Sequence, residues 1–326
     1  MNYRYLGNSG VQVSALGLGT NAFGKRADQD ASIRIIHCAL DSGINFIDTA
    51  NIYAGTESER IIGLALEGRR HDAVLATKAG LVREAGKPNA SGSSRRHLMH
   101  ELEGSLKRLK TDYVDLYQIH TFDPNTPLEE TLRALDDMVA SGKVRYIGAS
   151  NYAAWELMKA LGVSDAKGWT RFVSTQVSYS LADRTPEQEL VPMCLDQGVG
   201  IIPYFPLAGG ILTGKYGLTA EEAPDGSRVV TDPSFARFLD EGRIGLGLQV
   251  SQLAADLGCS PGVLSLAWLM KQPAVSTVIV GATRTEQLAD NLRSAELELT
   301  PETLDALTAM SDAFRYGKPF ANYRLS

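Results

Sequence analysis

Four ionisable residues stand at or just after the ends of three successive apolar segments in the first 120 residues of the chain. Asp48, Lys78 and His120 each close one segment, and Tyr53 follows Asp48 five positions later. Neighbouring strand ends lie about 4.8 Å apart, so an aspartate and a lysine there can form an ion pair beside a phenol and an imidazole. Any one of these residues alone would suit a structural role. The four together favour a catalytic site.

The segments that end in these residues belong to a longer alternation of short apolar and amphipathic stretches, which is typical of βα units. We predict eight strands, over residues 15–19, 45–48, 73–78, 113–119, 144–149, 172–176, 200–204 and 276–280. Eight such units fit a (β/α)8 TIM barrel better than an open doubly wound sheet. The expected additions to this single domain, residues 1–326, are an N-terminal hairpin (3–6 and 11–14), long loops after strands three and seven (83–94 and 205–243), and a C-terminal helix (301–310) with a tail (311–326).

In a barrel, the residues at the carboxyl ends of the strands converge on one pocket. Besides the four residues above, this places Thr20, Asn21, Ser150, Asn151, Gln176, Tyr204 and Gly281 around the pocket. Barrels bind phosphates with the loops after strands seven and eight and with a helix N-terminus. The corresponding segments here contain Leu207, Gly209 and Lys215, and then Thr283, Arg284, Gln287 and Asn291.

Five separated motifs resemble the signatures of the aldo-keto reductase family in order and spacing. They are Asp48-Thr49-Ala50-Asn51-Ile52-Tyr53, Ala76-Thr77-Lys78, Leu116-Tyr117-Gln118-Ile119-His120, Ile147-Gly148-Ala149-Ser150-Asn151 and Tyr204-Phe205-Pro206-Leu207. The resemblance implies that Tyr53 gives a proton to a substrate carbonyl, that Lys78 lies beside it, and that Asp48 holds Lys78. It also implies that His120 hydrogen-bonds the carbonyl oxygen. Such a phenol is expected to lose its proton more easily than one with the free pKa of about 10.

The same resemblance implies a nicotinamide cofactor. Ser150 and Asn151 match the positions that bind its carboxamide, with Gln176 beside them and the Tyr204 ring on the nicotinamide face. Arg284, Gln287 and Asn291 match the residues at the adenosine end. Many family members carry a lysine where this chain has Gly281, so NADPH preference over NADH rests mainly on Arg284, whose guanidinium can hold a 2′-phosphate bidentately. NADH remains an alternative, and Asn51 replaces an acidic residue that is frequent in related sequences.

Composition narrows the class of partner. The formal net charge is −6 with a pI near 5.5, and the chain has no long basic cluster, so nucleic acid is not expected. No segment approaches the ~20 apolar residues of a membrane span, and we expect a cytoplasmic protein. The three cysteines are predicted to be reduced. No metal is expected, because His97 and His100, one helical turn apart, are predicted to lie on a solvated helix face.

The sequence therefore predicts NADPH-dependent reduction of an aldehyde or ketone to an alcohol by reversible hydride transfer. One alternative is a sugar or alcohol dehydrogenase that runs in the oxidative direction. A second is a cofactor-binding regulatory or sensor subunit with little turnover, since a fold alone does not define function. A third is a lyase that forms a Schiff base on Lys78. The sequence does not specify the physiological substrate, the reaction direction or the oligomeric state.

Overall fold

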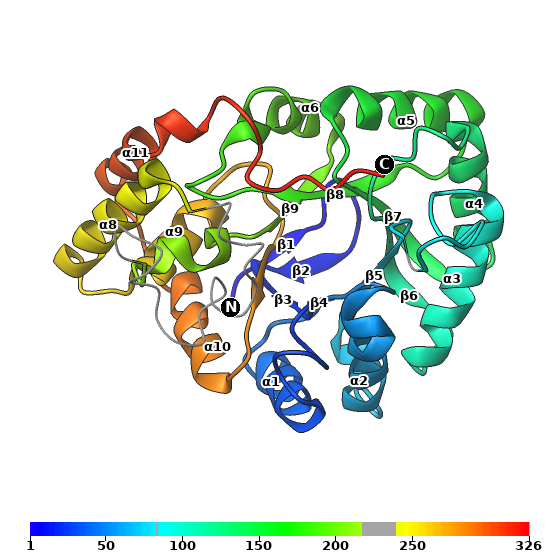
Figure 1. The fold of residues 1–326 in the computed structure, drawn as a ribbon, viewed down its shortest axis with the longest axis horizontal. Helices are drawn as coiled ribbons and strands as arrows, with labels where there is room; N and C mark the ends of the chain where they lie inside the picture. Colours follow the sequence, from blue (N-terminus) through cyan, green and yellow to red (C-terminus); the bar gives the residue numbers. More distant parts are fainter. Residues whose placement is uncertain (83, 217–238, 326) are drawn as a thin grey trace.

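The computed structural model describes residues 1–82, 84–216 and 239–325 and is shown in Figure 1. Within these ranges an eight-stranded parallel sheet has the order β10-β3-β4-β5-β6-β7-β8-β9. Its strands are β3 (Leu16–Gly19), β4 (Phe46–Asp48), β5 (Val74–Ala79), β6 (Val114–Ile119), β7 (Val144–Ser150), β8 (Phe172–Ser178), β9 (Gly200–Tyr204) and β10 (Val278–Gly281). All eight predicted strands are confirmed, each within two residues of its expected ends.

The two edges of this sheet meet, so the sheet is a nearly closed barrel. β10 pairs with β3 through Val278 and Leu16. At the other edge Ile201 of β9 forms a parallel bridge with Val275, just before β10 begins. There the backbone N–H of Ser276 donates to the carbonyl oxygen of Ile201 at 3.0 Å. The strand order is the chain order around the ring, and the predicted (β/α)8 TIM barrel is confirmed.

Helices surround the barrel (Figure 1). They are α1 (Gln29–Asp41), α2 (Glu57–Ala65), α3 (Arg95–Arg108), α4 (Leu128–Ala140), α5 (Ala154–Lys167), α6 (Leu190–Gln197), α8 (Glu241–Asp256), α9 (Pro261–Met270), α10 (Thr285–Leu292) and α11 (Pro301–Met310). α4 shows how the local sequence favours these helices. Glu129 and Glu130 lie in its first turn, where they complement the helix dipole, and Leu132 and Leu135 are buried against the barrel. Gly142 follows with a φ of 77°, which suits glycine.

The predicted N-terminal hairpin covers the amino-terminal end of the barrel. It consists of β1 (Tyr3–Tyr5) and β2 (Gln12–Ser14), which pair antiparallel. Leu6 and Val13 are fully buried there and cluster with Phe46 of β4. Gly7, with a φ of 54°, allows this close packing, because a Cβ atom there would lie 2.2 Å from the carbonyl oxygen of Val173. Among the described residues, the hairpin therefore leaves the opposite end of the barrel for a site.

The long connections differ in part from the prediction. Residues 84–94 contain no helix or strand, as expected. The second predicted loop, residues 205–243, contains the 3₁₀ helix η4 (Ala208–Thr213), and α8 already begins at Glu241, so the loop is shorter than predicted. The rest of it, residues 217–238, lies outside the described ranges. The predicted helix 301–310 is confirmed as α11, and the tail then runs to the region of α5 (Figure 1).

Three further expectations concern membranes, thiols and histidines. In the described ranges no single helix is long and apolar enough to cross a membrane, although α8 and α9 reach that length as a pair bent by 96°. The three cysteines carry no disulfide. The expectation that His97 is solvated is wrong, because it is 2% exposed on the face of α3 that packs against the barrel.

Candidate active site

A cavity of about 600 Å³ lies at the carboxyl ends of the strands. Sixteen of the eighteen residues predicted to form the site line it: Thr20, Asn21, Asp48, Tyr53, His120, Ser150, Asn151, Gln176, Tyr204, Leu207, Gly209, Lys215, Gly281, Thr283, Gln287 and Asn291. Lys78 is fully buried behind this surface. Arg284 is exposed and lies outside the lining.

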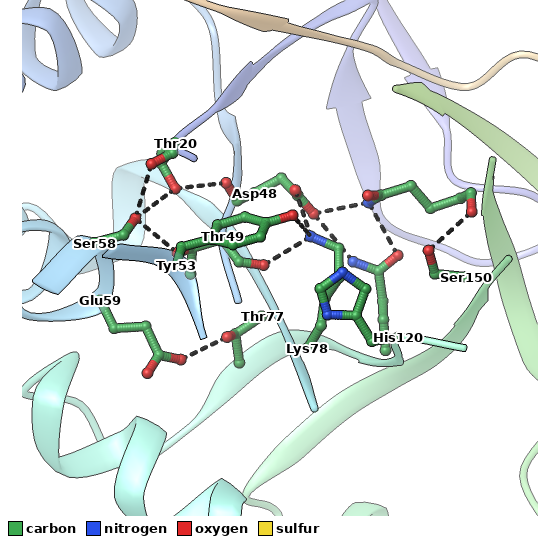
Figure 2. A network of polar contacts seen from close by, with 12 residues as sticks. Thr20, Asp48, Thr49, Tyr53, Ser58, Glu59, Thr77, Lys78, His120 and Ser150 are labelled. Carbon is green, nitrogen blue, oxygen red and sulfur yellow. Dashed lines mark hydrogen bonds and ion pairs between the residues drawn. The ribbon is translucent and has the colours of Figure 1, made fainter. Parts of the chain in front are cut away.

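Lys78 and Asp48 form an ion pair inside the barrel (Figure 2). The Lys78 ammonium donates to Oδ2 of Asp48 at 2.6 Å and to the carbonyl oxygen of Thr49 at 2.8 Å, and it lies 3.4 Å from Oη of Tyr53. Burial lowers the pKa of Lys78, and the Asp48 carboxylate opposes this change. Asp48 therefore keeps a cation in a place where an unpaired lysine would tend to lose its proton.

Two glutamine amides hold the other oxygen of Asp48. Nε2 of Gln176 donates to Oδ1 at 2.8 Å, and Nε2 of Gln118 donates to the same atom at 3.1 Å. Gln118 is fully buried. The sequence reasoning did not assign it a role, although a glutamine inside the apolar strand β6, in register with Lys78, is an unusual core residue. The Asp48 carboxylate thus receives three side-chain donors.

Tyr53 lies in η1 (Tyr53–Thr56), directly after the loop that follows β4. The turn bends sharply at Ala54 and Gly55, which both have positive φ. Burial, together with the nearby charge of Asp48, raises the pKa of the Tyr53 phenol well above its ordinary value. The expected lowering of this pKa is therefore not found, because desolvation and the Asp48 charge both raise it.

His120 faces Tyr53 across the cavity, with 6.0 Å between ring centroids. Burial and the Lys78 charge lower the pKa of His120 well below its ordinary value, so the imidazole is neutral near pH 7. Its Nδ1 is buried and has no hydrogen-bond partner among the described residues. The amide of Asn151 donates to the His120 carbonyl oxygen at 2.9 Å and helps to fix this strand end.

Beside His120, a group of polar side chains from β7, β8 and β9 lines the cavity. Asn151 adopts a φ of 57°, and its Oδ1 accepts from Oη of Tyr204 at 2.7 Å. Ser150 donates to the carbonyl oxygen of Gln176 at 2.9 Å. The C-terminal tail completes this end: the Ala321 carbonyl oxygen lies 3.0 Å from the Tyr204 hydroxyl, and Tyr323 lines the cavity.

The far end of the cavity combines open backbone with polar groups. Gly209 and Gly210 have φ values of 66° and 103° and present backbone without side chains. Oε1 of Gln287 accepts from both the backbone N–H and the hydroxyl of Thr283. Arg26 and Asp290 also line the cavity, and the sequence reasoning did not find them. Neither residue ends a strand, which is the signal that found the others.

Comparisons with known proteins identify relatives over nearly the whole chain. The sequence model of the Aldo/keto reductase family matches residues 15–312. An uncharacterized oxidoreductase of Bacillus subtilis, YrpG, is 40% identical over 94% of this chain and 95% of its own length. A putative voltage-gated potassium channel subunit beta of Schizosaccharomyces pombe is 37% identical over 93% and 91%.

A third relative is named for a reaction. It is the versiconal hemiacetal acetate reductase of Aspergillus parasiticus, 34% identical over 94% of this chain and 96% of its own length. The family match spans most of the barrel, and the oxidoreductase relatives are similar over nearly their whole length. The chain is an oxidoreductase that acts on carbonyl groups, and it belongs to the aldo/keto reductase family.

Proposed function

We propose that this protein reduces an aldehyde or ketone to the alcohol with NADPH, in a reversible reaction in which Tyr53 is the proton donor. The observation that carries the proposal is the group at the cavity wall, where the Tyr53 hydroxyl lies 3.4 Å from the Lys78 ammonium and opposite the neutral imidazole of His120. The substrate is a small molecule, because the reacting groups line a cavity at the barrel mouth.

The residues in the cavity fit a nicotinamide dinucleotide. Ser150, Asn151 and Gln176 gather amide and hydroxyl groups at one end, which suits a carboxamide. Gly209 and Lys215 offer backbone and a cation for phosphates. Thr283 and the start of α10 lie at the opposite end for the adenosine part, and Arg284, which is exposed beside them, can reach a 2′-phosphate. When bound, the reduced nicotinamide supplies the hydride.

The protein side chains then carry out the proton transfer. Because its pKa is raised, the Tyr53 phenol is protonated near pH 7 and can give its proton to the oxygen of a carbonyl that accepts hydride. Neutral His120 can donate a hydrogen bond to the same oxygen and orient the substrate. Lys78 stabilises the phenolate that remains, and Asp48 keeps Lys78 in place. In the reverse direction the same groups would accept the proton of an alcohol.

Loss of NADPH absorbance on mixing the protein with reactive aldehydes and ketones tests this function. We expect turnover by the wild type, and a preference for NADPH over NADH. Absence of turnover with either cofactor, over a broad panel tested in both directions, would contradict the proposal. An oxidative sugar or alcohol dehydrogenase would show turnover in the oxidative assay alone.

A second candidate is a cofactor-binding regulatory subunit. The observation that favours it is the similarity to a relative named as a potassium channel subunit beta. This function predicts tight NADPH binding with negligible turnover on the same panel, and copurification with a partner protein. Rapid turnover by the isolated chain would argue against it.

A further inference from the structure

Gln118 touches no surface of the cavity, yet it lies between two residues that do. It is fully buried in β6, and it is in register with Lys78 on β5. Its Nε2 donates to Oδ1 of Asp48 at 3.1 Å, and its Oε1 accepts from Nε2 of Gln176 at 3.2 Å.

The chemistry of these groups allows one orientation of both amides. An ionised carboxylate only accepts hydrogen bonds, so Gln118 and Gln176 must each turn an NH₂ group toward Asp48. Gln118 then offers its oxygen to the second N–H of Gln176. Both protons of the Gln176 amide are used in this way, at 2.8 Å and 3.2 Å.

What remains of the Gln176 amide is its oxygen. Gln176 lines the cavity, and among the described residues its Oε1 receives no hydrogen bond. The cavity wall therefore presents an acceptor at this point. An acceptor recognises a donor such as the NH₂ of a carboxamide, and it repels a carboxylate or a carbonyl oxygen.

We infer that Gln118 is a positioning residue: with Asp48 it fixes the Gln176 amide so that an acceptor faces the carboxamide of the nicotinamide cofactor, and it links this contact to the Asp48–Lys78 pair. The inference rests on the proposed function, because it takes the nicotinamide cofactor as the ligand. Gln118 acts through Gln176 and Asp48 and touches neither cofactor nor substrate.

A double-mutant cycle on NADPH binding tests this role. Gln118→Met keeps the length of the side chain and removes both amide groups. In the wild-type background we expect it to weaken NADPH binding, followed by cofactor fluorescence, by about fivefold, as for the loss of one hydrogen bond. In a Gln176→Met background the same change should have less than about a twofold effect, because the fixed amide is already gone.

Thr175→Val is the matched control. Thr175 is fully buried on β8 beside Gln176, and its hydroxyl has no hydrogen-bond partner among the described residues. This variant should bind NADPH as the wild type does. An equal loss from Gln118→Met in both backgrounds, or no loss in either, would overturn the inference, since a general packing defect acts the same way whatever residue occupies position 176.

The hydrogen bond from Gln118 to Asp48 gives a second readout, which is the rate of the reaction in each direction. Without the Gln118 amide, the Asp48 charge is less well solvated and raises the pKa of Tyr53 further, so alcohol oxidation at neutral pH should slow more than carbonyl reduction, for which the phenol is already protonated. Equal slowing in both directions would contradict this. If the protein binds NADPH but turns over no substrate, the proposed function fails and the binding cycle still decides the role of Gln118. A protein that binds no nicotinamide nucleotide overturns both.

Discussion

The Tyr53 hydroxyl lies 3.4 Å from the ammonium of Lys78, but the Asp48 carboxylate that neutralises this ammonium lies closer to it, at 2.6 Å. Lys78 therefore cannot act on the phenol as a free cation would. Its charge is shared with Asp48, and burial makes the protonated form of Tyr53 the stable one. This arrangement suits a residue that must hold its proton until hydride transfer makes the substrate oxygen basic.

Replacement of Tyr53, the proposed proton donor, should remove most of the activity. We expect Tyr53→Phe to lower kcat for carbonyl reduction by about 10² to 10⁴-fold, the usual contribution of a positioned acid, and to leave NADPH binding nearly unchanged. Stopped-flow or steady-state NADPH consumption measures the first effect and fluorescence titration the second. Tyr117→Phe is the control, because Tyr117 is buried away from the cavity and its hydroxyl donates a hydrogen bond to the carbonyl oxygen of Leu98. Full turnover by Tyr53→Phe would remove Tyr53 from the mechanism.

Removal of one member of the Asp48–Lys78 ion pair should lower both the free energy of unfolding and the reaction rate. Lys78→Met leaves the buried Asp48 carboxylate without its cation, which costs about 3–5 kcal/mol of unfolding free energy. Adding Asp48→Asn removes the stranded charge, so the double variant should unfold at higher urea than Lys78→Met alone while remaining inactive. Strictly additive losses of stability in urea titrations would show that the two groups are not coupled.

The pH dependence should differ between the two reaction directions. The pKa of His120 is lowered and that of Tyr53 is raised, so reduction should be level from about pH 6.5 to about pH 10, the ordinary values of these groups. Below its pKa the phenol is protonated and competent for reduction, and above it the activity falls. Oxidation needs the phenolate and should rise about tenfold per pH unit toward that pKa. A reduction rate that declines already between pH ~7 and ~8 would mean that Tyr53 has a lowered pKa in the working complex.

Substitution of Lys215 and of Arg284 should have different effects on NADPH and NADH binding, which distinguishes general phosphate binding from recognition of the 2′-phosphate. Lys215 lines the cavity near Gly209, so Lys215→Met should weaken NADPH and NADH binding alike. Arg284 lies outside the lining at the start of α10, so Arg284→Gln should weaken NADPH binding severalfold and spare NADH. Arg96→Gln, at an exposed position on α3, is the control. Equal effects of Arg284→Gln on both cofactors would place NADPH selectivity elsewhere.

The tail should affect the substrate more than the cofactor. Tyr323 lines the cavity beside Tyr204, with 6.1 Å between ring centroids. Tyr323→Ala should therefore raise KM for carbonyl substrates and change NADPH affinity little. Tyr316→Ala provides a control in the same tail, because that side chain is 64% exposed and lies outside the cavity lining. Unchanged KM values in the Tyr323 variant would restrict the tail to a structural role.

The barrel could be predicted from local sequence patterns, because the residues that favour each strand or helix lie within that element. The helix α4 (Leu128–Ala140) has acidic residues in its first turn and apolar residues at helical spacing, which are signals contained within the segment itself. The residues at strand ends line the cavity because parallel strands of a barrel all end at the same rim. Neither inference needed contacts between distant parts of the chain.

The features that the sequence did not reveal depend on such contacts. Gln118 reads as one polar residue in an apolar strand, and its partner Gln176 is distant in sequence and reaches it only across the closed barrel. Likewise the pKa of Tyr53 is raised by burial and by the charge of Asp48, with smaller contributions from Tyr323 and Tyr204, and no local pattern shows this environment. Arg284 matched a family position, but a motif does not show on which side of the cavity wall an exposed side chain lies.

The closure of the barrel and the tail across its mouth also determine when activity can arise during protein synthesis. β3 has no partner on one side until β10, ending at Gly281, has left the ribosome, and the cavity lacks one wall until Tyr323 has followed. The Asp48–Lys78 pair, in contrast, comes from neighbouring strands and can form early. A nascent chain can thus carry this ion pair for most of translation before the cavity is complete.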